Sequence, residues 1–356
     1  MRITIERSNL LKSLGHVHRV VERRNTIPIL SNVLVRRAET GGLRVTASNL
    51  DMEITMGFAC DIDADFAPFT ASAETLLDIV KALSDGASIR VEAAKTGIVL
   101  KSGRSKFQLQ TLPADDFPDG FAGAVESVAL EIAGQDLDRV LAQCSFAIST
   151  EETRYYLNGV HIHHDAEGLV FVATDGHKLA KRHLAYADVP DLPANIIIPT
   201  GAVKLLRGLA TEAGKDILAI EISELRITAH AGDIHIKSKL IDGSFPDYAR
   251  VIPRGLPTAI DLDAEALKAA IDRVGTISDK DSRVKFTLSP DGLKLSASSP
   301  EAGQAEDFID ADCATDLEIG FNGKYVLAAI AAIGTERLVL RLGDTQSPAI
   351  LQSPDA

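Results

Sequence analysis

The most metal-like stretch of the sequence is the run HIHHD at residues 161–165, with Asp175 and His177 a short distance beyond it. In an alternating strand, His161 and His163 share one face, so their imidazoles could act together as metal ligands. An ordinary edge strand explains the run as well, and no HExxH spacing on a helix supports a metal site. The hypothesis that this cluster leaves open is a metal-dependent hydrolase using His161, His163 and Asp175.

The usual signatures of covalent or nucleotide chemistry are absent from the sequence. There is no G-x-S-x-G turn for a nucleophilic serine, no Walker loop and no G-x-G-x-x-G fingerprint for a dinucleotide. Cys60, Cys144 and Cys313 are odd in number and far apart, which favours buried thiols over a disulfide framework or a zinc site. We therefore expect no catalytic residues, no metal and no cofactor.

Size and composition indicate a globular protein of two or three domains. The chain has 356 residues, of which 46% are hydrophobic and 24% charged, and it has no tryptophan. Arg2, Glu6 and Arg7 interrupt any signal peptide, and no apolar run approaches the roughly 18 residues of a membrane span. A cytoplasmic protein is expected. Its net charge of −13 argues against an anionic partner, unless the cations gather locally.

Internal repetition gives the domain organisation. The phrase Phe-Pro-Asp occurs at 117–119 and again at 245–247, a spacing of 128 residues (245 − 117). Three openings, at 3–17, 130–144 and 259–274, each read as a short strand, a polar capping residue and an amphipathic helix. A second strand and helix follow in each series, at 69–83, 196–209 and 319–333.

The repeats predict an α+β protein of three similar domains, at 1–125, 126–253 and 254–356. Each is expected to have two helices and about eight short strands in antiparallel sheets, because the strands come in hairpin-like runs rather than βαβ units. The third copy of Phe-Pro-Asp would fall about 15 residues beyond Ala356, so we expect its last strand to be missing.

The positive charge is concentrated on helical faces. In the first helix an apolar stripe is accompanied, on another face, by Lys12, His16, Arg19 and Arg23. The cations of the other five helices are Lys81, Arg139, Lys204, Arg207, Lys268, Arg273 and Lys324. Solvated faces explain each helix alone, and a monomeric binding scaffold stays possible. If all six helices line one surface, however, the chain would bind DNA phosphates without reading bases.

Several phrases together resemble a known family. They are SGRSKFQLQTLPADDFP, RYYLNGV, VATDGHKLA, KLIDGSFPDYARVIP and EIGFNGKYVLAAI, and they span nearly the whole chain in order. The family is the bacterial DNA polymerase III beta subunit, the DNA sliding clamp. The resemblance implies a head-to-tail homodimer, a ring that encircles double-stranded DNA with helices lining its hole. It also implies a non-enzymatic processivity factor without a membrane partner, which binds the polymerase III alpha subunit, the clamp loader, other polymerases and repair proteins through short peptide motifs.

The same resemblance implies three groups of functional residues. The partner-peptide pocket would comprise Leu157, Thr174, Gly176, His177, Lys178, Leu179, Pro246, Arg250 and Val251. DNA contact is implied for Arg24, Tyr155 and Tyr156, and subunit contact for Ile79, Phe107 and Leu109 against Ile277. The chain differs from the family's pattern in its short end, in the acidic Glu151 and Glu152 before the Tyr pair, and in Lys178, where relatives often carry Arg.

Overall fold

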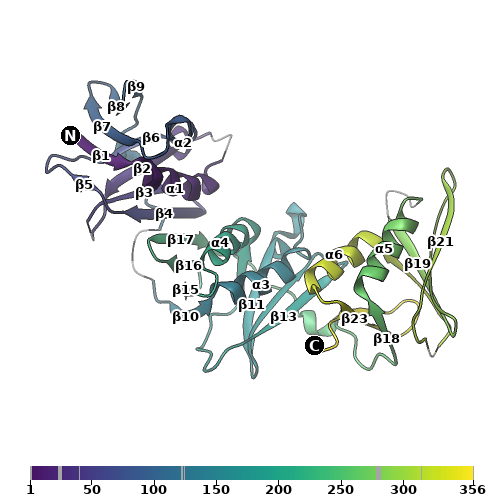
Figure 1. Cartoon of the computed structure of the whole chain (residues 1–356). Helices are drawn as coiled ribbons and strands as arrows, with labels where there is room; N and C mark the ends of the chain where they lie inside the picture. The colour runs from purple at the N-terminus through teal and green to yellow at the C-terminus, as the bar shows by residue number, and fades with distance from the viewer. Residues whose placement is uncertain are drawn as a thin grey trace. The chain divides into compact units, whose positions relative to one another are not determined.

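The computed structural model describes residues 2–22, 26–39, 41–121, 123, 125–277, 282–313 and 315–355 (Figure 1). One order of elements occurs three times along the chain. A strand leads into a helix, three strands follow (four in the first repeat), a further strand leads into a second helix, and a closing run of strands ends the repeat. This arrangement confirms the predicted α+β class with antiparallel sheets.

Among the described residues, the first repeat contains two helices and nine strands. They are β1 (Arg2–Glu6), α1 (Arg7–Val17), β2 (Asn32–Arg37), β3 (Leu43–Ser48), β4 (Met52–Phe58), β5 (Asp61–Ile62), β6 (Phe69–Ser72), α2 (Ala73–Ala82), β7 (Ser88–Ala94), β8 (Gly97–Ser102) and β9 (Ser105–Leu109). Three short 3₁₀ turns accompany them, η1 (His18–Val20), η2 (Pro28–Ser31) and η3 (Ala114–Asp116).

The second repeat has the same order with eight strands. Its elements are β10 (Val128–Ala133), α3 (Gly134–Ser145), η4 (Glu152–Leu157), β11 (Gly159–Asp165), β12 (Gly168–Thr174), β13 (Leu179–Ala185), β14 (Ile196–Pro199), α4 (Thr200–Ala213), β15 (Ile217–Ile222), β16 (Arg226–Ala231), β17 (Ile234–Lys239) and η5 (Tyr248–Arg250).

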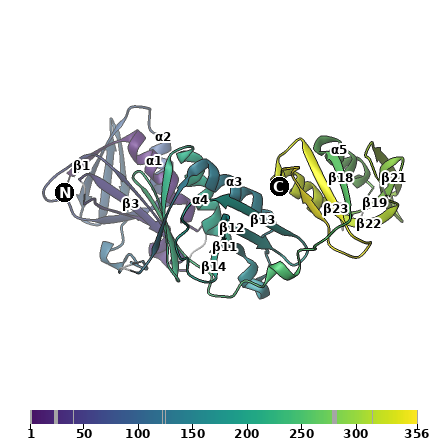
Figure 2. The ribbon, with the colours of Figure 1, turned by 90° about the horizontal axis from the view of Figure 1, so that it is seen from below.

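The third repeat comprises β18 (Thr258–Asp263), α5 (Ala264–Gly275), β19 (Arg283–Ser289), β20 (Gly292–Ser299), β21 (Gly303–Ile309), β22 (Leu317–Asn322), α6 (Gly323–Ile333), β23 (Arg337–Leu342) and β24 (Ile350–Gln352). Side chains cap its helices: Asp263 accepts the Ala266 N–H before α5, and Asn322 accepts two N–H groups before α6. In Figure 2, α5 lies between the strand β18 and the sheet that contains β19 and β21. Leu267, Phe286 and Leu295 belong to the core that this packing buries.

In the part of the chain that the structure describes, the strands form five antiparallel sheets. Their orders are β5-β1-β7-β8-β9, β10-β15-β16-β17-β4-β3-β2-β6, β13-β12-β11-β14, β18-β23-β24 and β21-β20-β19-β22. The eight-stranded sheet joins two repeats, because β17 of the second pairs with β4 of the first, with Ile236 opposite Ile54. Burial alternates along β15 and β18, which is the pattern of strands with one face on a core.

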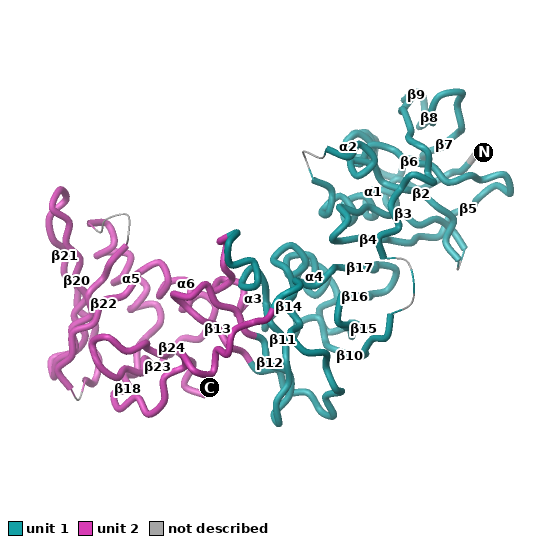
Figure 3. Tube along the Cα trace, turned by 180° about the vertical axis from the view of Figure 1, so that it is seen from behind, with its two compact units in different colours: residues 1–141, 152–171, 183–243 teal, residues 142–151, 172–182, 244–356 magenta. Residues whose placement is uncertain are grey.

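Contacts divide the chain into two compact units, which Figure 3 shows in different colours. Unit 1 contains residues 1–141, 152–171 and 183–243, and unit 2 contains residues 142–151, 172–182 and 244–356. Because these limits differ from those of the repeats, the domain boundaries expected after residues 125 and 253 stay predictions. Among the described residues, no helix combines the length and apolar character needed to cross a membrane.

Candidate functional site

The turn between β12 and β13 is held by a compact set of hydrogen bonds. The Gly176 N–H donates to Thr174 Oγ1 (3.1 Å), and the N–H groups of His177 and Lys178 both donate to Asp175 Oδ1 (2.9 Å each). Thr174 Oγ1 in turn donates to the Lys178 carbonyl (2.8 Å). A short polar side chain that accepts N–H groups two and three residues ahead is a common way to fix a turn. The turn therefore presents His177 in a defined position.

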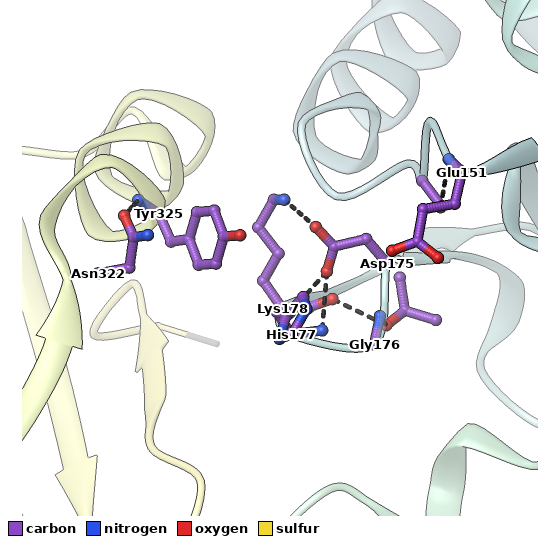
Figure 4. A network of polar contacts seen from close by, with 9 residues as sticks. Glu151, Asp175, Gly176, His177, Lys178, Asn322 and Tyr325 are labelled. Atoms are coloured by element: carbon purple, nitrogen blue, oxygen red, sulfur yellow. Dashed lines mark hydrogen bonds and ion pairs between the residues drawn. The ribbon is translucent and has the colours of Figure 1, made fainter. Parts of the chain in front are cut away.

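Lys178 connects this turn to helix α6 within unit 2 (Figure 4). Its ammonium group forms an ion pair with Asp175 and lies 4.3 Å from the centroid of the Tyr325 ring. Burial of Asp175 disfavours its charge, but the Lys178 ammonium and the two N–H donors outweigh that effect and hold the pKa of the carboxyl group below its usual value. The three side chains thus form one charged and aromatic contact.

His177 and Tyr325 begin a large groove on unit 2. Their ring centroids are 6.4 Å apart, and both side chains line a cavity of about 1180 Å³ over the sheet of β19 to β22. Asn322, whose Oδ1 accepts the Tyr325 N–H (3.3 Å), lines it too. Tyr325 and Asn322 were not among the site residues expected from the sequence. The available signal was the helix cap in FNGKYV, but nothing in the sequence shows that this helix start lies beside His177.

The remaining expected pocket residues lie in other segments. Pro246, Arg250 and Val251 lie in and around η5, where Val251 is 61% exposed and Arg250 forms an ion pair with Asp247 (2.8 Å). Leu157 belongs to unit 1 and is only 4% exposed at the end of η4, and Leu179 is half-buried at the start of β13. The structure brings together residues 174–178, and the grouping of all nine residues in one pocket stays a prediction.

Two of the residues expected to contact DNA are described. Tyr155 is 54% exposed, and its ring meets that of Tyr156 edge to face, with centroids 5.9 Å apart. Gly243 passes close to both side chains, because a Cβ there would lie 3.1 Å from Tyr156 Cβ and 3.5 Å from Tyr155 Cε2. Arg24 lies outside the described residues. An exposed tyrosine beside a half-buried one leaves a surface on which a phosphate or a base could rest, and DNA contact stays a prediction.

The residues expected at the subunit contact include two at a sheet edge. Phe107 and Leu109 belong to β9, the last strand of its five-stranded sheet, and both are half-buried. Ile79 is half-buried on α2, and Ile277 is half-buried just after α5. Half-buried apolar side chains on an edge strand leave apolar surface for another strand to cover. A contact between subunits stays a prediction.

The histidine cluster offers little to a metal. The rings of His161 and His163 are 5.4 Å apart, but His161 Nδ1 lies 3.0 Å from the Ile196 carbonyl oxygen, and burial lowers the pKa of His161 to about 4. Within the described ranges, no group of three or more His, Cys, Asp or Glu side chains is placed to hold a metal ion. The geometry therefore gives the hydrolase hypothesis no support.

Comparisons with known proteins agree along the whole chain. Family models of the three domains of the DNA polymerase III beta subunit match this chain in order. The N-terminal domain model matches residues 1–120, the central domain model residues 131–247 and the C-terminal domain model residues 249–356. The beta sliding clamp of Caulobacter vibrioides (strain NA1000 / CB15N) is 41% identical over 363 residues, which cover 99% of this chain and 96% of the relative. The chain belongs to the beta sliding clamp family.

Other clamps give the same result in sequence and structure. The clamp of Escherichia coli K12 is 35% identical over 353 residues, covering 98% of this chain and 94% of the relative. The crystal structure of a sliding clamp from Bartonella birtlesii, bound to griselimycin, superimposes with a TM-score of 0.93 at 40% identity, covering 100% of this chain and 96% of that one. Sliding clamps are processivity factors of DNA polymerase III and not its catalytic subunits. The predicted family, fold and non-enzymatic function are therefore confirmed.

One expectation about the clamp's helices is wrong. The sequence pattern placed His16 with Lys12 on a free basic face of α1, but His16 is buried, with 8% exposure, and its Nε2 lies 3.1 Å from Glu212 of α4. Lys12 contacts the same carboxylate (3.4 Å). Burial lowers the pKa of His16 even though Glu212 opposes the change. A 3–4 spacing selects one helical face, but it cannot show that a second helix covers part of it.

Proposed function

We propose that this sliding clamp closes as a homodimer into a ring around double-stranded DNA. There it holds the DNA polymerase III alpha subunit, the clamp loader, and other polymerases and repair proteins by short peptide motifs. The observation that carries the proposal is the pairing of β17 with β4 inside one chain. This strand pairing continues one sheet from the first repeat into the second, and the same kind of pairing between edge strands can join two chains.

The strands that would join two chains can be identified by repetition. In the first repeat the counterpart of β17 is β9, since each is the second strand of a hairpin that follows a short Gly-containing turn. In the third repeat the counterpart of β4 is β21. Both β9 and β21 are outer strands of their respective sheets. Edge strands have unpaired backbone groups that a second chain can complete. We infer that β9 of one subunit pairs with β21 of the other.

The in-chain register then predicts the register between chains. Across β17 and β4, His235 lies opposite Thr55 and Ile236 opposite Ile54. The hairpin registers make Lys106 the counterpart of His235 and Glu306 the counterpart of Thr55. Lys106 should therefore lie opposite Glu306 of the second subunit, with Phe107 opposite Ala305. An opposite-charge pair and a covered aromatic ring are both favourable in a sheet.

The partner-peptide pocket is proposed at the nine residues expected from the family, with Asn322 and Tyr325 added from the groove beside His177. Apolar walls with a few polar groups suit a short extended peptide that carries apolar anchors. The relative from Bartonella birtlesii was crystallised with griselimycin, and a Caulobacter crescentus clamp with polyethylene glycol at a putative beta-motif tethering region. Those ligands were bound by the relatives, and in this chain the pocket is supported by its own turn and groove.

Binding to DNA is proposed to be independent of base sequence and to take place in the cytoplasm. Lys81, Lys204 and Lys324 are exposed on α2, α4 and α6, whereas the arginines of α3 and α4 form ion pairs with Asp136 and Asp138. A few exposed cations attract phosphates weakly and with strong salt dependence. Enclosure, rather than affinity, would keep such a protein on DNA.

The test uses the topology of the DNA. The clamp, loaded by its ATPase partner onto nicked circular DNA, should stay bound during gel filtration and be lost once the circle is cut to a linear molecule. Equal retention on circular and linear DNA would mean that binding rests on contacts with the DNA and not on enclosure. Sedimentation of the free protein at twice 38.0 kDa would in addition exclude a monomeric scaffold.

A further inference from the structure

The turn that presents His177 has a duplicate in the first repeat, at residues 48–52. There the Leu50 N–H donates to Ser48 Oγ (3.1 Å), and the N–H groups of Asp51 and Met52 donate to Asn49 Oδ1 (3.2 and 2.8 Å). In both turns the N–H of the second residue donates to the carbonyl oxygen of the fifth: Asn49 N–H to Met52 O (3.1 Å), and Asp175 N–H to Lys178 O (3.3 Å). The two turns thus share four hydrogen bonds at equivalent positions, 126 residues apart.

One position differs in a way that matters for the space beside the turn. Gly176 has a φ of 89°, and its counterpart Leu50 has a φ of 76°, a conformation that a residue with a branched side chain rarely adopts. Such a conformation persists only where the surroundings enforce it. The side chain of Leu50 packs against a separate apolar cluster of unit 1, and that packing is what holds it there.

The cluster contains Ile29, Leu30, Leu34 and Phe117. Leu30 lies in η2, and its counterpart Leu157, 127 residues later, lies in η4. The cluster therefore occupies the position in the first repeat that the proposed pocket occupies in the second. Phe117 belongs to the first Phe-Pro-Asp phrase and is 5% exposed, whereas Phe245 of the second phrase is only half-buried. The linker that carries Phe117 continues past the turn, since a Cβ on Gly120 would lie 3.7 Å from the Leu50 carbonyl oxygen.

We propose that the first repeat holds a second copy of the partner-peptide pocket in a closed form, whose occupants are the chain's own Phe117 and Leu50. The side chain of Phe117 takes the place of an apolar anchor from a partner, and Leu50 fills the space that Gly176 leaves open. The ligand class of the emptied site is an apolar side chain or a small aromatic molecule. Each chain consequently offers partners one open pocket rather than two.

The assignment of partner peptides to the open copy rests on the proposed function. The closed site can be tested without any peptide. Phe117→Ala removes the occupant and leaves a cavity lined by Ile29, Leu30 and Leu34; apolar cavities of this kind stay dry and bind small aromatic molecules. Toluene is the probe. It should bind Phe117→Ala at one molecule per chain and raise its Tm, and leave the Tm of the unaltered protein unchanged.

The matched control is Phe121→Ala in the same linker. Phe121 is also 5% exposed, and it lines a cavity of about 460 Å³ among charged side chains such as Glu53 and Lys237. Phe117 and Leu34 line the same cavity, but of the two phenylalanines only Phe117 belongs to the apolar cluster. Toluene should not bind there, because a polar cavity fills with water. Toluene binding to both variants alike, or to neither, would overturn the proposal.

A variant that fails to fold still gives an answer. If Phe117→Ala is unfolded at room temperature, refolding it in toluene-saturated buffer should restore the folded fraction seen by circular dichroism, because toluene then takes the place of the missing ring. Absence of any recovery in toluene would count against the closed site. Loss of polymerase-peptide binding by variants of His177 would be a separate result, since that residue lies in the other copy of the turn.

Discussion

Reversing one charge at the proposed subunit seam should weaken the clamp dimer, and reversing its partner as well should restore it. The pair is Lys106 on β9 and Glu306 on β21 of the second subunit, which the register of β17 and β4 places opposite each other. Lys106 lies opposite Lys101 on its own sheet, and Lys101 is already paired with Glu92 (2.6 Å). An acid from a second chain is therefore the favourable neighbour for Lys106.

The size of the effect follows from the geometry of the seam inside the chain. There Lys237 and Glu53 make the cross-strand ion pair, with 3.4 Å between Nζ and Oε1. Exposed pairs of this type contribute about 0.2–1 kcal/mol, and like charges directly opposite cost a similar amount. Lys106→Glu should then cost about 1 kcal/mol at each seam and about 2 kcal/mol for a ring with two seams. A loss of that size weakens dimerisation about 30-fold.

The measurement is sedimentation equilibrium of four proteins at low salt: the unaltered clamp, Lys106→Glu, Glu306→Lys and the double variant. Each single variant should dissociate at higher concentrations than the unaltered protein, and the double variant should return near to its value. Lys95→Glu, at an exposed turn of the same sheet, is the control for the change in net charge. If the double variant is as weak as the sum of the single variants, the register is wrong.

Three further results are expected. His177→Ala or Pro246→Ala should weaken binding of a fluorescent polymerase peptide while sedimentation still shows the dimer, and unchanged affinity would remove the pocket from these residues. Lys178→Met should lower the free energy of unfolding by about 1–2 kcal/mol, because it removes the ion pair with Asp175 and the contact with the Tyr325 ring; Lys204→Met, exposed on α4, should leave it unchanged. Because the pKa of Asp175 is lowered in the folded state, its carboxylate contributes stability that is present above about pH 4 and is lost as the pH falls through the lower folded value. In urea melts from pH 2 to 6, Asp175→Asn should show a smaller loss in acid, and an unchanged pH slope would contradict the assignment.

Much of the fold could be predicted from sequence, because the three repeats carry local signals. Alternating apolar residues at 130–132 and 258–262 became strands with one buried face, and Asp263 before an apolar helical stripe became a helix cap. The candidate site was predictable only in part. Residues 174–178 form one hydrogen-bonded turn because the turn chemistry of Thr and Asp is local, but the ring that accompanies it, Tyr325, lies roughly 150 residues away in sequence.

The amino-acid sequence by itself determined the three-part repeat, the identity of the family and the position of each helix and hairpin, since these depend on neighbours within a few residues. Tertiary structure alone decided which repeated features remain open and which are filled. His16 has the spacing of a surface cation, yet α4 covers it, and Phe117 has the same phrase as Phe245, yet it is buried in an apolar cluster. Burial depends on segments brought together from distant parts of the chain, and identical local phrases cannot specify it.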